Sequence, residues 1–278
     1  MFSYVVVALN EESNIFDCVS SIKSFGAKDI YVLDGGSTDG TISIAMDLGC
    51  KVIELPGSSI SIRRGYALEN IDCEFLFFVD ADQRLASEYS ERDLFSYFNN
   101  DENLAGLQLR LEADTSTSGY WAKGFAERLK IITGTPGKRR VIGTPCVFKN
   151  EIAKNIGYDI HLTGPSDDTL FCSKIVAAGY NLMAVKEVAY EIVRGTFKGT
   201  VKKAFWYGMG DAEYIRSDRK NLLRHLYHVY IRGIGIYPLQ AFFTTSYLAP
   251  FFLIFGLTRG FGLFYGSLTR GDLSKTRS

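Results

Sequence analysis

The stretch Asp34-Gly35-Gly36-Ser37-Thr38-Asp39-Gly40 decides the fold of this chain, together with Asp80-Ala81-Asp82 further along. Each stretch directly follows a short apolar run, Ile30–Leu33 in the first case and Phe75–Val79 in the second. Apolar runs of this length predict buried strands. Ligands of open α/β sheets bind at the carboxyl ends of the strands, so acids at both strand ends predict a binding site there.

The two carboxylates of the second stretch suit a hard cation. Asp80 and Asp82 are two residues apart, so on an extended segment their side chains point to the same side. Proteins usually hold Mg²⁺ with one or two carboxylates plus substrate phosphates. The alternative is a pair of solvated acids at a strand end. The pattern favours an enzyme that uses a nucleotide diphosphate.

Apolar runs with strand length alternate with segments of helical periodicity, which predicts an α/β fold with a mostly parallel sheet. The expected strands are Tyr4–Leu9, Ile30–Leu33, Lys51–Leu55, Phe75–Val79, Ala105–Leu111, Val141–Phe148 and Val188–Val193. The expected helices are Asn14–Phe25, Thr41–Leu48, Ser61–Asn70, Trp121–Ile131 and Leu170–Ala178.

Four motifs occur in an order that resembles the family 2 glycosyltransferases. They are Asn10-Glu11-Glu12 after the first strand, the two stretches above, and Ser166-Asp167-Asp168-Thr169-Leu170 followed by Ala178-Gly179-Tyr180. In the last motif Asp167 stands where the family usually has Glu. The resemblance covers roughly residues 1–215. It implies the GT-A fold, a Rossmann-like sheet flanked by helices, and an inverting, nucleotide-sugar-dependent transferase.

The resemblance also implies roles for individual carboxylates. Asp80 and Asp82 would hold Mg²⁺ or Mn²⁺, with Asp82 as the main ligand. Asp168 would be the general base, because an acceptor hydroxyl must lose its proton as it attacks the sugar. The alternative for Asp168 is an N-terminal cap of the helix Leu170–Ala178.

Further residues are expected to contact the nucleotide sugar, and a UDP-sugar is favoured over a GDP-sugar. Each has a structural alternative: Asp34 suits a turn, Glu11 a helix start, and Arg63 an exposed helix position. The expected contacts are Asn10, Glu11, Asp34, Arg63, Asp80, Arg194 and Lys198.

The composition indicates the setting of the protein. The chain has 278 residues and a formal net charge of zero. Its five cysteines show no C-x-x-C spacing, which fits buried small hydrophobic residues in a reducing compartment. His161, His225 and His228 show no metal-ligand spacing, so we expect structural or surface roles for them.

Charge is distributed unevenly along the chain. Residues 1–193 carry 18 Lys/Arg and 27 Asp/Glu, whereas residues 194–278 carry 13 and 4. An uncharged run of 25 residues, Gly233–Leu257, lies in the basic part. We therefore expect a catalytic domain over 1–215 and a basic, apolar helical tail over 216–278 that associates with a membrane.

The tail allows three arrangements. An interfacial or re-entrant helical pair is favoured, because basic residues flank the apolar run on both sides and would both be cytoplasmic. A single span and an oligomer-forming helix pair are the alternatives. The favoured arrangement places the protein on the cytoplasmic face of the cell membrane, where a lipid-linked or glycan acceptor lies, and excludes nucleic acid as the partner.

Two other functions compete with sugar transfer. Nucleotidyltransferases also bind nucleotides on an α/β sheet, but they usually open with a basic, Gly-rich loop, whereas the loop here contains Glu11 and Glu12. A sugar-nucleotide-binding or nucleic-acid-binding module would not need Asp80, Asp82 and Asp168 together.

Overall fold

The computed structural model describes residues 1–114, 118–162, 164–193 and 195–269. The chain divides into two compact units. Unit 1 comprises Met1–Asp114, Leu129–His161 and Phe171–Ile192. Unit 2 comprises Thr115–Arg128, Leu162–Leu170 and Val193–Ser278. The expected boundary between residues 215 and 216 stays a prediction.

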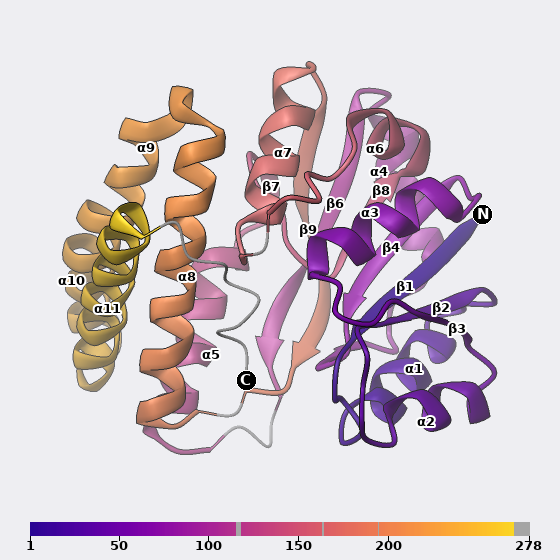
Figure 1. Ribbon diagram of the computed structural model, residues 1–278, viewed down its shortest axis with the longest axis horizontal. Helices are drawn as coiled ribbons and strands as arrows, with labels where there is room; N and C mark the ends of the chain where they lie inside the picture. Colours follow the sequence, from indigo (N-terminus) through magenta and orange to yellow (C-terminus); the bar gives the residue numbers. More distant parts are fainter. Residues whose placement is uncertain (115–117, 163, 194, 270–278) are drawn as a thin grey trace. The chain divides into compact units, whose positions relative to one another are not determined.

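Unit 1 is built on one mixed sheet, which has nine strands in the described part of the chain (Figure 1). The strand order is β3-β2-β1-β4-β8-β6-β9-β5, and β7 pairs with β9. The first four strands of the order pair in parallel, and β8 enters antiparallel between β4 and β6. The strands are β1 (Phe2–Ala8), β2 (Ile30–Asp34), β3 (Lys51–Glu54), β4 (Phe75–Asp80), β5 (Gln83–Leu85), β6 (Leu104–Ala113), β7 (Gly137–Arg139), β8 (Cys146–Lys149) and β9 (Asn181–Glu191).

Helices cover both faces of this sheet because side chains alternate between the faces along each strand. Phe75 of β4 meets Phe98 of α4, with ring centroids 4.7 Å apart. Leu76 and Phe78, on the opposite face, share a buried cluster with residues of α3, α6 and α7. The helices with residues in unit 1 are α1 (Ile15–Ser24), α2 (Thr41–Asp47), α3 (Ile60–Asn70), α4 (Glu91–Asn100), α5 (Tyr120–Thr133), α6 (Asn150–Ile156) and α7 (Asp167–Ala177).

Some of the predicted strand boundaries were wrong, and several elements were not predicted. The strand expected from Val141 begins at Cys146, after Pro145, which has no N–H to give to a ladder. The strand expected from Val188 already begins at Asn181. The short elements β5, β7 and α6 and the helix α4 were not predicted from the sequence.

Unit 2 is helical in its C-terminal part, and its helices pack with unusually close backbones. A Cβ on Gly208 would lie 2.1 Å from the carbonyl oxygen of Arg259, and one on Gly262 would lie 2.4 Å from that of Phe205. Small residues permit such close packing of helices. The elements are α8 (Phe197–Ser217), η1 (Arg219–Asn221), α9 (Leu222–Leu226), the π-helix η2 (Tyr227–Ile236), α10 (Tyr237–Thr244), η3 (Ser246–Leu248) and α11 (Ala249–Leu268).

A buried ion pair joins α8 to α11. Asp211 accepts hydrogen bonds from Nε and Nη2 of Arg259 at 2.6 and 2.8 Å, and its Oδ1 lies 2.9 Å from Nε2 of His225. Burial raises the pKa of Asp211, but Arg259 and His225 outweigh it, so the pKa is lowered overall. His225 therefore has the structural role expected from the sequence.

One segment of unit 2 has the length and composition of a membrane span. Among the described residues only Ser246–Leu268 meets that description, and part of it is buried inside the protein. The chain thus has the α/β sheet flanked by helices that the sequence predicted, followed by an apolar helical segment.

Candidate active site

Three neighbouring parallel strands of unit 1 end at the same edge of the sheet. Ala8 at the end of β1 pairs with Asp34 at the end of β2, and Val7 pairs with Asp80 at the end of β4. The loops that follow these strands therefore meet at one place, as the sequence predicted.

The loop after β2 is organised by Asp34. Its carboxylate accepts hydrogen bonds from the backbone N–H of Gly36 and Ser37, at 2.8 and 2.7 Å, and from the hydroxyl of Ser37. The side chain is fully buried. Asp34 therefore stabilises the turn, which was the structural alternative for this residue. Its contact with a nucleotide stays a prediction.

The loop after β1 is hydrogen-bonded to the loop after β2. The N–H of Asn10 donates to the hydroxyl of Ser37 at 2.8 Å, and Oδ1 of Asn10 accepts from the N–H of Thr38 at 2.9 Å. The N–H of Glu11 donates to the hydroxyl of Thr41 at 2.8 Å. Asn10 has a φ of 56°, in the left-handed region that Asn tolerates better than most residues. These bonds fix both loops in one shape.

Arg63 of α3 is buried rather than exposed, so the exposed alternative is wrong for this residue. Only 1% of its surface is accessible. Its Nη1 donates to the carbonyl of Ala8 at 2.6 Å, and a Cβ on Gly35 would lie 2.8 Å from the same nitrogen. The guanidinium therefore lies against the ends of β1 and β2, and Gly35 leaves the room that it needs.

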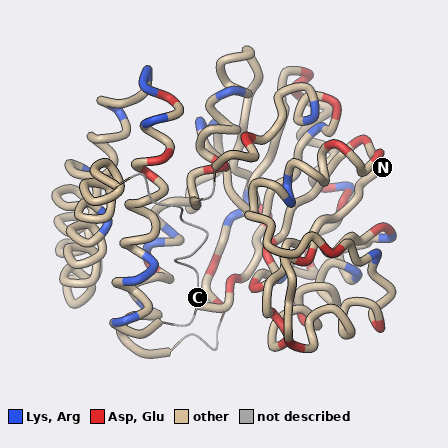
Figure 2. Tube along the Cα trace, in the orientation of Figure 1, with Lys and Arg blue, Asp and Glu red and all other residues tan. Residues whose placement is uncertain are grey.

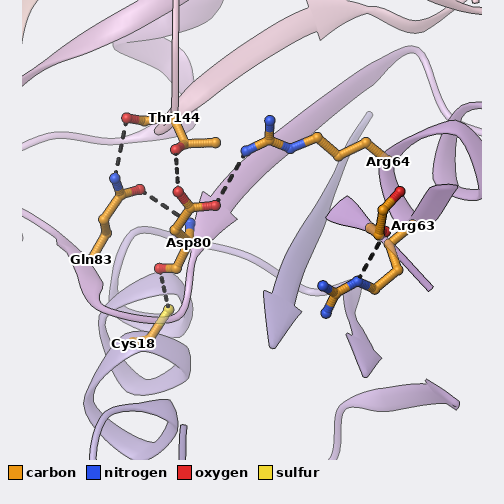
Figure 3. A network of polar contacts seen from close by, with 7 residues as sticks. Cys18, Arg63, Arg64, Asp80, Gln83 and Thr144 are labelled. Atoms are coloured by element: carbon orange, nitrogen blue, oxygen red, sulfur yellow. Dashed lines mark hydrogen bonds and ion pairs between the residues drawn. The ribbon is translucent and has the colours of Figure 1, made fainter. Parts of the chain in front are cut away.

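Asp80 is held by a polar network (Figure 3). Its Oδ2 accepts from the hydroxyl of Thr144 at 2.6 Å, and its Oδ1 lies 3.3 Å from Nη2 of Arg64. The N–H of Asp80 donates to Gln83, whose own amide donates to the carbonyl of Thr144 at 3.1 Å. The thiol of Cys18 lies 3.6 Å from the carbonyl oxygen of Asp80. Sequence reasoning missed Arg64, Gln83 and Thr144. For Arg64, the available signal was its position next to Arg63 in a predicted helix.

The chemistry of this strand end fits a hard divalent cation. Burial, followed by the negative charges of Asp82 and Asp80, raises the pKa of the Cys18 thiol well above its usual value. No group of three or more His, Cys, Asp or Glu side chains suited to a metal occurs among the described residues. A cation here would take its other oxygen ligands from a substrate diphosphate or water, which suits Mg²⁺ or Mn²⁺.

Asp82 lies in unit 1, where its carbonyl oxygen accepts the N–H of Ile192 at 3.0 Å, and the other predicted residues belong to unit 2. Asp167 and Asp168 occupy the first turn of α7, where Asp167 is buried and Asp168 is half-buried. These two adjacent acids therefore differ in their exposure to solvent. Lys198 is exposed in the first turn of α8, and Arg194 lies outside the described residues.

Comparison with known proteins assigns the chain to a family. The fold and the three strand-end loops define an α/β protein of the GT-A class. The family model described as glycosyl transferase family 2 matches residues 3–157, which is more than half of the chain. The chain belongs to glycosyl transferase family 2, so the resemblance recognised in its motifs is confirmed.

Relatives and solved structures agree with this assignment. An uncharacterised glycosyltransferase of Rickettsia typhi, RT0209, is 30% identical over 182 residues, which are 60% of this chain and 62% of that relative. The mannosyltransferase PcManGT from Pyrobaculum calidifontis, solved with GDP-Man and Mn²⁺, has a TM-score of 0.59 at 16% identity, over 99% of this chain and 77% of that chain. Residues 1–349 of S. aureus TarS, solved with UDP-GlcNAc, give 0.55 at 18% identity, over 77% and 66%. At these identities the structures show the fold alone.

Proposed function

We propose that this chain is an inverting, metal-dependent glycosyltransferase that moves a sugar from a nucleotide-diphosphate sugar to a lipid-linked or glycan acceptor. The observation that carries the proposal is the meeting of three strand-end loops, which brings Asn10, Asp34 and Asp80 to one edge of the sheet. Membership of the family supports it, as do the nucleotide sugars bound by PcManGT and TarS.

The donor's nucleoside would bind between the loops after β1 and β2. The side chains of Asn10 and Glu11 would contact the nucleoside from the first loop. Asp34 stabilises the fold of the second loop. Because Arg63 is buried against Ala8 and Gly35, we assign it to positioning these loops. A UDP-sugar is proposed in preference to a GDP-sugar. Lys198 and Arg194 would bind the diphosphate.

Asp82, with Asp80, would hold Mg²⁺ or Mn²⁺. A bound cation neutralises charge on the diphosphate and on the leaving group. Thr144 and Arg64 fix the orientation of the Asp80 carboxylate before any ligand arrives. Fixed orientation raises the value of a charged group at a site where charge develops.

Asp168 would act as the general base in a single displacement. The acceptor oxygen forms a bond to the anomeric carbon while the bond from that carbon to the diphosphate oxygen breaks, and the hydroxyl proton moves to the Asp168 carboxylate. The configuration of the sugar inverts. If the acceptor is a lipid phosphate, the nucleophile is already anionic, and Asp168 orients it instead.

Action at a membrane completes the proposal. The basic, apolar part of unit 2 would hold the protein at the cytoplasmic face of the cell membrane, as a monomer or a homo-oligomer. A reducing compartment is part of the proposal, because the spacing of the five cysteines matches no disulfide framework.

A screen of nucleotide sugars tests the proposal. We expect one UDP-sugar, or failing that a GDP-sugar, to raise the melting temperature and to be hydrolysed slowly to the nucleoside diphosphate, only when Mg²⁺ or Mn²⁺ is present. Release of pyrophosphate instead would indicate a nucleotidyltransferase. Full activity in excess chelator would contradict the metal requirement, and retention of anomeric configuration by NMR would contradict the inverting mechanism.

A further inference from the structure

The helix α11 is apolar apart from Arg259 and a few hydroxyl residues, and part of its surface is exposed. The face that contains Phe252, Phe255 and Gly256 is buried, and the Arg259 and Gly262 region packs against α8. Five of its exposed apolar side chains recur at helical spacing as one stripe, which consists of Leu253, Leu257, Phe261, Phe264 and Leu268. Phe261 is 60% and Leu268 71% exposed. Contiguous apolar surface on this scale marks an interaction site.

The segment formed by α9 and η2 carries two stripes next to each other. Leu223, Tyr227 and Ile231 are exposed at intervals of four residues. One position further along the chain at each step lie Arg224, His228 and Arg232, of which the two arginines carry a positive charge. Adjacent apolar and basic stripes on one helical segment are typical of helices that lie in the membrane interface.

The charges that act on the middle of this stripe are positive. Burial, then the positive charges of Arg232, Arg224, His225 and Arg259, lowers the pKa of His228. The nearby Asp211 is already bonded to Arg259 and His225. The charge of Arg224 and Arg232 is thus available to an anionic surface.

We propose that the exposed stripe of α11 and the exposed stripes of α9 and η2 dock on an anionic phospholipid bilayer. In this arrangement α10 and α11 lie in the interface of one leaflet and do not cross it. The apolar stripe of α11 enters the acyl boundary, and Arg224 and Arg232 contact the headgroup phosphates. Figure 2 shows α10 and α11 almost wholly without charged residues. The proposal rests on the membrane association proposed above and specifies the face, the depth and the lipid.

The packing of α11 against α8 argues against a span. A spanning α11 would take α8 with it into hydrocarbon, because Asp211 of α8 is bonded to Arg259 of α11 and the backbones touch at Gly208. However, α8 carries Lys198, Lys202 and Lys203 at one end and Glu213 and Arg216 at the other. Charged side chains at membrane depth are costly, so the pair of helices stays at the surface.

Vesicle binding by the full chain tests the proposal. We expect binding to phosphatidylcholine vesicles that contain phosphatidylglycerol, and weak binding to phosphatidylcholine alone. The double variant R224Q/R232Q should lower the partition coefficient roughly 30-fold, which corresponds to about 1 kcal/mol for each residue. The matched control R219Q/K220Q removes the same charge from η1 and should lower it less than about threefold. Equal losses in both variants would overturn the role of the stripe.

The apolar contact is tested in the same assay. Replacing Phe261 or Phe264 by Ser should lower partitioning by more than roughly tenfold. The matched control Phe16→Ser, at a phenylalanine of α1 that is 57% exposed, should leave it unchanged. A stable dimer in light scattering that does not bind vesicles would assign the surface to a second copy of this chain and overturn the proposal.

Depth is tested by exchange. Interfacial docking is reversible, so the protein should redistribute when an excess of unlabelled vesicles is added, whereas a spanning helix stays in place. Retention on the first vesicles would overturn the interfacial arrangement. Loss of vesicle binding with intact metal-dependent donor hydrolysis would overturn this inference alone. Binding without any hydrolysis would instead contradict the proposed function.

Discussion

Unit 1 and unit 2 each contain an aspartate paired with an arginine, and the two pairs differ in exposure and geometry. The Asp80 side chain is 37% exposed and makes one contact of 3.3 Å with Arg64. The Asp211 side chain is 2% exposed and accepts two bonds from Arg259 at 2.6 and 2.8 Å. A half-open pair at a sheet edge can change partners when a ligand binds. A buried bidentate pair cannot separate without leaving an unpaired charge.

The comparison of Asp80 with Asp211 suggests that some carboxylates contribute to the reaction and others to the stability of the fold. A variant of Asp168 tests this distinction within unit 2. Asp168→Asn keeps the shape but removes the proton acceptor, so kcat should fall by about 10²- to 10⁴-fold while the KM for the donor is unchanged. The melting temperature should stay near that of the wild type. Collapse of donor affinity in the variant would show that Asp168 faces the nucleotide or supports the fold.

Asp211 should behave in the opposite way. Asp211→Leu leaves Arg259 without its buried partner, so we expect the free energy of unfolding to fall by about 3 to 5 kcal/mol. The double variant D211L/R259L removes both charges and should recover most of this loss. Chemical denaturation measures both. If the double variant is as unstable as the single one, the pair is not the source of the stability.

Asp82 should affect turnover without affecting the fold. Asp82→Asn should lower kcat by about 10²- to 10³-fold, because one contact that stabilises charge at the leaving group contributes a few kcal/mol. The apparent Mg²⁺ or Mn²⁺ affinity should weaken in titrations of activity. Wild-type turnover in this variant would remove Asp82 from the proposed site.

The smallest effect concerns acid stability. Arg259 and His225 hold the pKa of Asp211 below its ordinary value, so its contribution to stability is present above the unfolded pKa, about 3.9, and is lost as the pH falls through the lower folded value. The difference in unfolding free energy between the wild type and D211N should therefore shrink below about pH 4. A difference that stays constant from neutral to acid pH would contradict the lowered pKa.

The sequence predicted the strand ends that form the site better than the residues that hold the side chains of the site in place. Apolar runs that end in acids located the three strand ends, because a buried strand and a strand-end carboxylate are both local features. Arg64, Gln83 and Thr144 depend on contacts between residues far apart in the chain, such as Thr144 with Asp80, and no local period encodes them. Asp211 and Arg259 had a faint signal, since each interrupts an otherwise apolar or neutral stretch.

The close backbones of α8 and α11 have a practical consequence for preparing this protein. Gly208 and Gly262 accept no side chain, whereas Leu253, Leu257 and Phe264 are exposed. Polar replacements confined to Leu253, Leu257 and Phe264 should therefore yield a detergent-independent form with the native helix packing. Random surface redesign that reaches the glycines should not. The exposed face of α11 thus tolerates substitution, whereas the face that packs against α8 does not.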